Sequence, residues 1–205
     1  MCQDEHNFYL DSPTPHRYDE ISPEKTHMTL DSETLRHAMR AWTTGVAVVT
    51  AKYEDQQYGM TVNSFNSVSL EPPVISVALK QLTHTHTLVV KSGMFAVTIL
   101  NSEQKELSDR FAGKIPDIMD RFEGVQISRL SIDVPVIKNG LAFFNCRVMN
   151  STPIGENTLF IAEVIDASGE GEGNPLVYHN RVYWKLDPTQ PSPKFGEFEG
   201  GHGRG

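Results

Sequence analysis

The residues best suited to do chemistry lie in one polar stretch, GMTVNSFNSVSLEPP at residues 59–73. Short polar side chains are interspersed there with apolar ones. The polar members are Thr61, Asn63, Ser64, Asn66, Ser67 and Ser69, and the apolar members are Val62, Phe65, Val68 and Leu70. Small hydroxyls, amides and free backbone N–H groups can bind a flat, heteroatom-rich ligand without a charged side chain. The alternative is a polar loop between two core strands, the commoner use of such a composition.

A second polar group lies at Lys80 and in the THT segment of residues 83–85, just before an expected short helix. Hydroxyls at a helix N-terminus suit a phosphate, because the helix offers unpaired N–H donors and the positive end of its dipole. Lys80 would add a cation. The alternative is a plain capping role, which Thr85 could fill as N-cap without any ligand.

His84 and His86 form a His-x-His pair, which is one element of many metal sites. A metal site needs a third and usually a fourth ligand, and the next residues are Thr, Leu, Val, Val and Lys. At a helix start, moreover, side chains two positions apart diverge. We therefore predict no metal site here.

Composition and charge narrow the class of protein. A chain of 205 residues fits one domain with tails, and its net charge of −8 argues against a nucleic-acid-binding surface. No apolar run is long enough to span a bilayer and no basic-then-apolar leader opens the chain, so we expect a cytoplasmic protein with no membrane partner. Cys146 lies on the apolar face of an expected strand and is predicted to be a packed core thiol.

Apolar periodicity predicts many strands and a few short helices. Strands are expected at about residues 45–52, 57–63, 74–79, 95–100, 141–152, 158–167 and 181–186. Helices are expected at about 32–41, between the strands at 74–79 and 95–100 with its end at Gly93, and at 102–112. Asn101 and Gln104 could form a capping-box-like pair at the start of the last helix, and Gly113 follows its end.

Strands with hairpin-scale links predict a mainly β (α+β) antiparallel barrel rather than a doubly wound sheet. No strand followed by Gly-x-Gly-x-x-Gly and a helix is present, so a dinucleotide would not be held in the Rossmann manner. Residues 1–28 mix prolines and acidic residues without periodicity and predict a flexible arm. Residues 188–205 predict a flexible tail, which leaves one domain at residues 29–187.

Several segments in order resemble the flavin reductase family, the reductase partners of two-component flavin monooxygenases. The resemblance runs from about residue 35 to 186. The segments that carry it are RAWTTGVAVVT (40–50), GMTVNSF (59–65), SVSLEPP (67–73), SGMFAV (92–97), DRFEGV (120–125), LAFFNCRV (141–148) and PLVY (175–178). It implies an FMN-binding split β-barrel and a homodimer with flavin near the subunit interface.

The resemblance also implies where flavin would bind. The positions that match the family's flavin contacts are Met60, Thr61, Val62, Asn63, Ser64, Ser67, Val68 and Ser69. Val62 and Val68 could cover the ring. The family places Ser-x-Thr seven residues before Ser-Gly, a spacing matched by Thr83 and Thr85 before Ser92. We therefore expect Lys80, Thr83, His84 and Thr85 to hold the phosphate of FMN, or of FAD.

One segment departs from the family. The usual triplet Gly-Asp-His, whose histidine is associated with the reduced nicotinamide, is here Gly155, Glu156 and Asn157. Asparagine can hydrogen-bond a carboxamide, but it cannot become cationic and stacks less well. We expect these residues to contact the nicotinamide or another substrate. The alternative is a simple turn between two strands, since asparagine tolerates positive φ.

The expected function is the reduction of FMN or FAD by NADH or NADPH, to supply a partner monooxygenase with reduced flavin. No pair of nucleophile and base stands out, and we predict no catalytic side chain, because the hydride passes through the flavin. Two alternatives stay open. One is a flavoprotein of the same fold that acts on a substrate or redox partner other than a nicotinamide. The other is a non-catalytic protein that stores or senses FMN.

Overall fold

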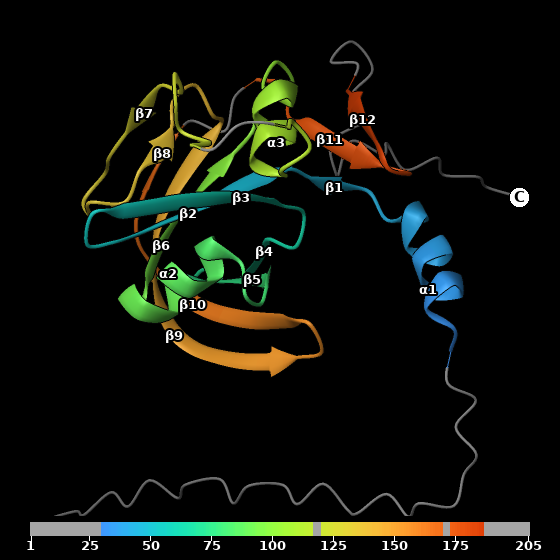
Figure 1. Ribbon diagram of the computed structural model, residues 1–205, viewed down its shortest axis with the longest axis horizontal. Helices are drawn as coiled ribbons and strands as arrows, with labels where there is room; N and C mark the ends of the chain where they lie inside the picture. The colour runs from blue at the N-terminus through green and yellow to red at the C-terminus, as the bar shows by residue number, and fades with distance from the viewer. Residues whose placement is uncertain (1–29, 117–119, 170–172, 187–205) are drawn as a thin grey trace, which may run out of the picture.

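The computed structural model describes residues 30–116, 120–169 and 173–186, and its main feature is a curved antiparallel sheet of seven strands (Figure 1). The strand order is β3-β2-β6-β9-β10-β5-β4, so β3 and β4 are the edges. The strands are β2 (Ala47–Tyr53), β3 (Gln56–Val62), β4 (Asn66–Ser69), β5 (Val74–Lys80), β6 (Met94–Ile99), β9 (Ala142–Ile154) and β10 (Asn157–Ser168). The mainly β architecture predicted from the sequence is confirmed.

Two smaller sheets lie beside the large one. One has the order β1-β11-β12, from β1 (Thr44–Gly45), β11 (Leu176–His179) and β12 (Val182–Lys185). The other pairs β7 (Ile127–Ser128) with β8 (Val136–Ile137). Of these five strands, the sequence predicted β12 separately and β1 only as the start of a longer strand.

The three α-helices within the described ranges are short. Helix α1 (Ser32–Ala38) is continued by a 3-10 turn (η1, Met39–Ala41), and the Asp31 carboxylate accepts a hydrogen bond of 3.1 Å from the Thr34 amide. Helix α2 (His84–Ser92) ends at Gly93, which takes the predicted left-handed conformation with φ +66°. Helix α3 (Lys105–Phe111) begins later than expected. Gln104, its N-cap, does accept from the Asn101 amide over 3.1 Å, as the predicted pair requires.

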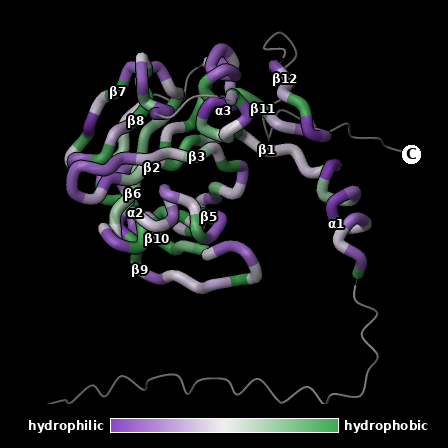
Figure 2. The backbone as a smooth tube through the Cα atoms, in the orientation of Figure 1, coloured by the Kyte–Doolittle hydropathy of each residue, from purple (hydrophilic) through white to green (hydrophobic). Residues whose placement is uncertain are grey.

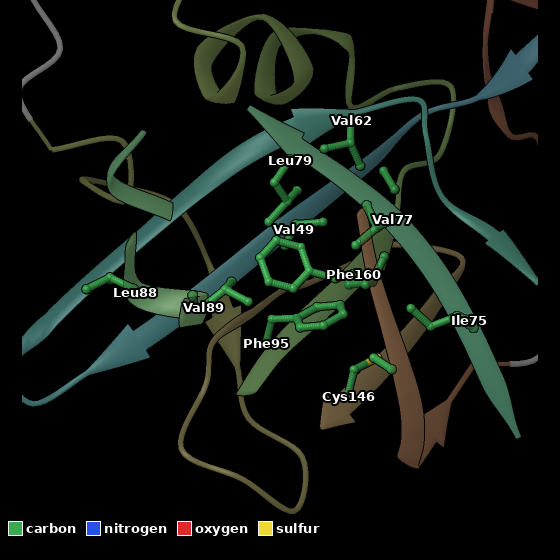
Figure 3. Close-up of a cluster of buried hydrophobic side chains, with 14 residues drawn as sticks. Val49, Val62, Ile75, Val77, Leu79, Leu88, Val89, Phe95, Cys146 and Phe160 are labelled. Carbon is green, nitrogen blue, oxygen red and sulfur yellow. The ribbon is translucent and has the colours of Figure 1, made fainter. Parts of the chain in front are cut away.

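Two apolar clusters lie on opposite faces of β2. Val49 and its alternate neighbours face the larger cluster, which also contains Phe95, Cys146 and Phe160 (Figure 3). Val48 faces the smaller cluster, with Phe111 at the end of α3. Because both faces are covered, the strand is a continuous apolar run instead of an alternating one. This double burial fixes β2 and β3 between α2 and α3.

Cys146 is fully buried, and burial raises the pKa of its thiol to about 12, so the predicted core thiol is confirmed. Helix α1, by contrast, buries none of its residues and stands apart from the sheet (Figure 1). None of the helices in the described ranges is long and apolar enough to cross a membrane. The expected arm at residues 1–28 and the expected tail at 188–205 lie outside the described residues.

Candidate functional site

A cavity of about 650 Å³ lies between β3, the loop from β5 into α2, and the end of α3; we call it the main cavity. Its lining comes from segments far apart in the sequence. The lining residues are Tyr58, Gly59, Met60, Thr61, Lys80, Thr83, His84, Thr85, Phe111, Ala112 and Arg121. Six of the twelve predicted flavin residues are therefore brought together here: Met60, Thr61, Lys80, Thr83, His84 and Thr85.

One wall of the main cavity is formed where α3 packs on β3. A Cβ atom at Gly59 would lie 2.8 Å from the Phe111 ring, so the close packing of the ring on the strand requires glycine. The Arg121 guanidinium ties the two elements together, because one of its nitrogens donates to the Gly59 carbonyl (3.1 Å) and to the Phe111 carbonyl (2.8 Å). Both of these bonds come from one nitrogen, so the other nitrogens of the Arg121 guanidinium take no part in them.

The opposite wall is the start of α2. Thr83, and not Thr85, is the N-cap: its hydroxyl accepts from the His86 amide (3.3 Å) and donates to the Lys80 carbonyl (2.9 Å). Thr85, two residues further along the chain, is buried and also belongs to the cavity lining. The ammonium of Lys80 is largely exposed at the rim. Hydroxyls, a helix start and two cations thus surround one space, which suits an anionic group.

The two histidines of the His-x-His pair turn to different neighbours. His84 stacks on Tyr58, with ring centroids 4.5 Å apart and planes inclined by 17°. His86 bonds through Nε2 to the Thr158 hydroxyl at 2.9 Å, and burial lowers the pKa of its imidazole. No group of three metal-ligating side chains occurs in the described part of the chain.

A smaller cavity of about 240 Å³ adjoins the main one; we call it the side cavity. The two cavities share Thr61 and Ala112. The complete lining of the side cavity is Val46, Thr61, Val62, Asn63, Ala112, Lys114, Tyr178 and Tyr183. It adds Val62 and Asn63 to the predicted flavin residues that border a cavity. The Thr61 hydroxyl donates to the Ser108 carbonyl over 2.7 Å and so also anchors α3.

Four predicted flavin residues border neither cavity: Ser64, Ser67, Val68 and Ser69. The Ser64 hydroxyl is occupied by β5, since it donates to the Ala78 carbonyl (2.9 Å) and accepts from the Ala78 amide (3.2 Å). The other three belong to β4, the edge strand that pairs with β5. From the sequence this segment was interpreted only as a polar stretch. Val68 is 56% exposed, so a ring-covering role for it needs a ligand outside both cavities.

The triplet Gly155, Glu156 and Asn157 forms the turn of the β9–β10 hairpin and the first residue of β10. Gly155 takes the positive φ of +56°, which leaves Asn157 in an extended strand. The hairpin is tied to the loop that leads into α2. The Gln81 amide donates to the Glu156 carbonyl (2.9 Å), and the Gln81 side chain donates to the Asn157 carbonyl (2.8 Å). Glu156 also pairs with Lys80 at 3.6 Å.

The lining fits a flavin nucleotide. A volume of about 650 Å³ is within the range of 300–1,000 Å³ that small-molecule and cofactor sites occupy. The main cavity offers cations and hydroxyls for a phosphate, and the adjoining side cavity offers apolar and aromatic walls for a flat ring. Because the two cavities meet at Thr61, one elongated ligand with an anionic end and a flat end could enter both.

Several lining residues have no feature in the sequence that indicates a role. Tyr58, Phe111, Ala112 and Lys114 come from segments with no hydroxyl-rich or glycine-rich signature. Arg121 stands in the DRFEGV segment that contributed to the family resemblance, and a cation in a matched segment was the one available signal. Only the fold places it beside Gly59, 62 positions away in sequence.

Comparison with known proteins gives a consistent result. A family model described as "Flavin reductase like domain" matches residues 39–187. The FMN reductase (NADH) SmoA of Agrobacterium fabrum is 37% identical over 161 residues, which is 76% of this chain and 87% of that protein. The reductase component of a 4-nitrophenol 4-monooxygenase/4-nitrocatechol 2-monooxygenase of Rhodococcus opacus is 33% identical, over 78% of this chain and 83% of its own length. Among solved structures, the flavin reductase PheA2 superposes with a TM-score of 0.71 at 37% identity, covering 77% of this chain and 99% of its own.

Proposed function

This chain belongs to the flavin reductase like family, and we propose that it is an NAD(P)H-dependent flavin reductase. It would reduce FMN, or FAD, and supply the reduced flavin to a partner monooxygenase. SmoA is named an FMN reductase that uses NADH, and the Rhodococcus opacus relative is named the reductase component of a monooxygenase. Like the two-component systems to which such relatives belong, this protein would then act with a second protein that consumes its product.

The observation that supports the proposal best is the main cavity. Residues from β3, from the start of α2 and from the end of α3 meet there, although these segments are far apart in the sequence. Of the lining residues, Thr83 and Thr85 offer hydroxyls, and Lys80 and Arg121 offer positive charge. We propose that these four bind the flavin phosphate.

The ring would lie toward the side cavity. Backbone groups and side chains of residues 61–63 line this part, and Val62 offers an apolar surface. A flavin bound there accepts a hydride from a reduced nicotinamide, and the protein contributes position and electrostatics. Ser67, Val68 and Ser69 would complete the site on β4, where an exposed strand edge is available to a ligand or to a second subunit, and Ser64 would hold the adjoining backbone through its bonds to Ala78.

We place part of the nicotinamide nucleotide near the β9–β10 hairpin, while its nicotinamide ring lies against the flavin ring, as hydride transfer requires. The turn of the hairpin is held against the loop that carries Lys80 and Thr83, so a nucleotide bound at Asn157 would be next to the main cavity. The Asn157 side chain would hydrogen-bond a polar group of this nucleotide, and it would stay neutral at every pH.

Initial rates of NADH and NADPH oxidation, with FMN, FAD or riboflavin as acceptor, test the proposal. We expect turnover with at least one nicotinamide. We also expect the reaction to saturate at a lower concentration of FMN than of riboflavin. The protein could instead bind flavin without oxidising either nicotinamide. If an added redox partner then reduces the bound flavin, the first alternative, a flavoprotein with another electron donor, is supported. If nothing reduces it, the storage function is supported instead.

A further inference from the structure

Lys114 is the one charged residue in the lining of the side cavity, as far as the described residues go. It follows α3 and shares this lining with Thr61, Val62 and Asn63, three of the predicted flavin residues. Two aromatic rings, Tyr178 and Tyr183, complete the same wall with centroids 5.5 Å apart. A cation thus borders the apolar space that we assign to the flat end of the ligand.

The position of the Lys114 ammonium is fixed by three contacts. It lies 2.9 Å from an oxygen of Asp109 and 3.3 Å from the Tyr183 hydroxyl, and it stands 5.0 Å from the centroid of the Tyr183 ring. The Tyr183 hydroxyl in turn donates to the same Asp109 oxygen over 3.1 Å. Contact with a ring face and a carboxylate together holds an otherwise flexible side chain in one place.

Asp109 binds a second lysine, and this makes the cluster cationic. The ammonium of Lys105 lies 2.9 Å from the other Asp109 oxygen and 5.6 Å from the Tyr183 ring centroid. Two ammonium groups on one carboxylate leave a net charge of +1. The hydrogen bond to Asp109 raises the pKa of Lys114, so its ammonium stays protonated at neutral pH. Lys105 has almost the same partners but does not border the side cavity.

This charge matters for a flavin because of what reduction does to the ring. The oxidised ring is neutral. When it takes up a hydride, the nicotinamide becomes oxidised, and the ring gains one negative charge along with the new N–H bond. A nearby cation therefore interacts more strongly with the reduced ring than with the oxidised ring.

We infer that Lys114 is a specificity-determining residue for the redox state of the flavin: its ammonium favours the anionic reduced ring over the neutral oxidised ring. The inference rests on the proposed function and adds to it a named residue outside the sequence motifs. Asp109 and Tyr183 act as positioning residues, because they hold the ammonium at the wall of the side cavity.

The test compares Lys114→Gln with Lys105→Gln, which removes a charge from the same carboxylate and the same ring at a position outside the cavity. Anaerobic titration gives the affinity of each protein for oxidised FMN and for chemically reduced FMN. We expect Lys114→Gln to lose about tenfold in affinity for reduced FMN and less than about twofold for oxidised FMN. A tenfold change in this ratio lowers the potential of the bound two-electron couple by about 30 mV. Lys114→Arg should keep the wild-type ratio, and Lys105→Gln, which removes a charge of the cluster outside the cavity, should change the ratio less than Lys114→Gln does.

Thermal unfolding checks that each variant folds, and Lys114→Met, which keeps the aliphatic stem, is a second neutral variant. Equal ratios for wild type, Lys114→Gln and Lys114→Met would overturn the inference, and so would an equal drop for Lys105→Gln. A wild-type protein that reduces FMN with a nicotinamide while these ratios stay equal would leave the proposed function intact. Failure of the wild type to bind either form of FMN would overturn both.

Discussion

Thr83 and Thr85 line the same cavity, but their hydroxyl groups have different surroundings. The Thr83 hydroxyl caps α2 and bonds the Lys80 carbonyl, so it is partly committed to the fold. Thr85 is buried in the first turn of the helix and belongs to the lining of the cavity. If both serve a phosphate, removal of the Thr85 hydroxyl should affect the ligand alone, whereas removal of the Thr83 hydroxyl should also affect stability.

The first prediction is that Thr85→Val weakens FMN binding about tenfold and leaves riboflavin binding within about twofold of the wild type. A hydrogen bond to a charged group contributes about 1.5–3 kcal/mol, and only FMN carries the phosphate. Thr87→Val is the matched control, since the Thr87 hydroxyl lies on the exposed side of the same helix and bonds the Thr83 carbonyl. Fluorescence titration of both flavins gives the ratio. An unchanged ratio in Thr85→Val would remove this residue from the phosphate site.

At the residue scale, the sequence identified the side chains with an obvious chemical signature. Thr83, Thr85 and Lys80 could be selected because hydroxyls and a cation precede a helix. Arg121 and Lys114 could not be assigned a role, because each reaches its cavity only through tertiary packing of α3 on β3. The choice of N-cap was open for a similar reason: both threonines satisfy the pattern, and the exact start of the helix decides between them.

At the element scale, the β9–β10 hairpin holds the triplet Gly155, Glu156 and Asn157, which differs from the family's usual one, beside the main cavity. Gln81 binds the backbone of Glu156 and of Asn157, so the hairpin turn is fixed relative to the start of α2. The side chain of Asn157 is exposed and takes no part in these two bonds. A substitution there should therefore change what the hairpin binds and leave the hairpin in place.

The second prediction concerns this side chain. Asn157→Ala should raise the Michaelis constant for the nicotinamide about three- to tenfold, the effect of one lost neutral hydrogen bond, with FMN affinity unchanged. Asn157→His should improve use of the nicotinamide or introduce a pH dependence between about pH 5 and 8, the range in which histidine titrates. Steady-state kinetics across this pH range measure both. If neither variant alters NADH or NADPH kinetics, the triplet is a structural turn and the donor binds elsewhere.

The third prediction concerns β4. Ser67→Leu should weaken FMN binding without lowering the melting temperature, because Ser67 is exposed on an edge strand and a bulky side chain meets no core there. Ser64→Ala should instead lower the free energy of unfolding by about 1 kcal/mol, since its hydroxyl satisfies two backbone groups of Ala78. Thermal melts and FMN titrations of the pair separate the two roles. Wild-type FMN affinity in Ser67→Leu would exclude β4 from the site.

Strands with a buried apolar face were predictable, and strands without one were not. The runs that became β2, β5 and β6 are rich in valine and isoleucine and fall within a few residues of their expected bounds. β4 has exposed, mostly polar residues, so nothing in its own pattern distinguishes it from a loop. β1 and β11 are short and stabilised by pairing with each other, which is a non-local property.

At the scale of the whole molecule, α1 stands apart from the sheet (Figure 2), and the described residues leave apolar side chains between α1 and Trp42 uncovered. Leu35 lies in α1, Met39 begins the 3-10 turn η1, and Trp42 follows that turn in an extended conformation; each is more than half exposed. Exposed apolar side chains gathered in this way are typical of an interaction surface. Together with the family resemblance, it supports the proposal of a homodimer in which α1 packs against the second subunit.

The fourth prediction is that the wild-type protein is a dimer at micromolar concentration and that Leu35→Ser, Met39→Ser and Trp42→Ser together convert it to a monomer. Burial of three large apolar side chains contributes several kcal/mol to association, and serine cannot replace it. Light scattering after size-exclusion chromatography measures the mass. His37→Ser, on the same helix, is the control and should stay dimeric. A monomeric wild type, or a dimeric triple variant, would show that α1 does not form the interface.

The central claim is that the two adjoining cavities hold a flavin that a reduced nicotinamide can reduce. The most direct measurement is the absorption spectrum of the protein with FMN, recorded without oxygen before and after addition of NADH or NADPH. We predict that the oxidised flavin spectrum bleaches within the mixing time of a conventional assay, and much more slowly in Thr85→Val at limiting FMN. A flavin that binds to the wild type but stays oxidised with both nicotinamides would contradict it.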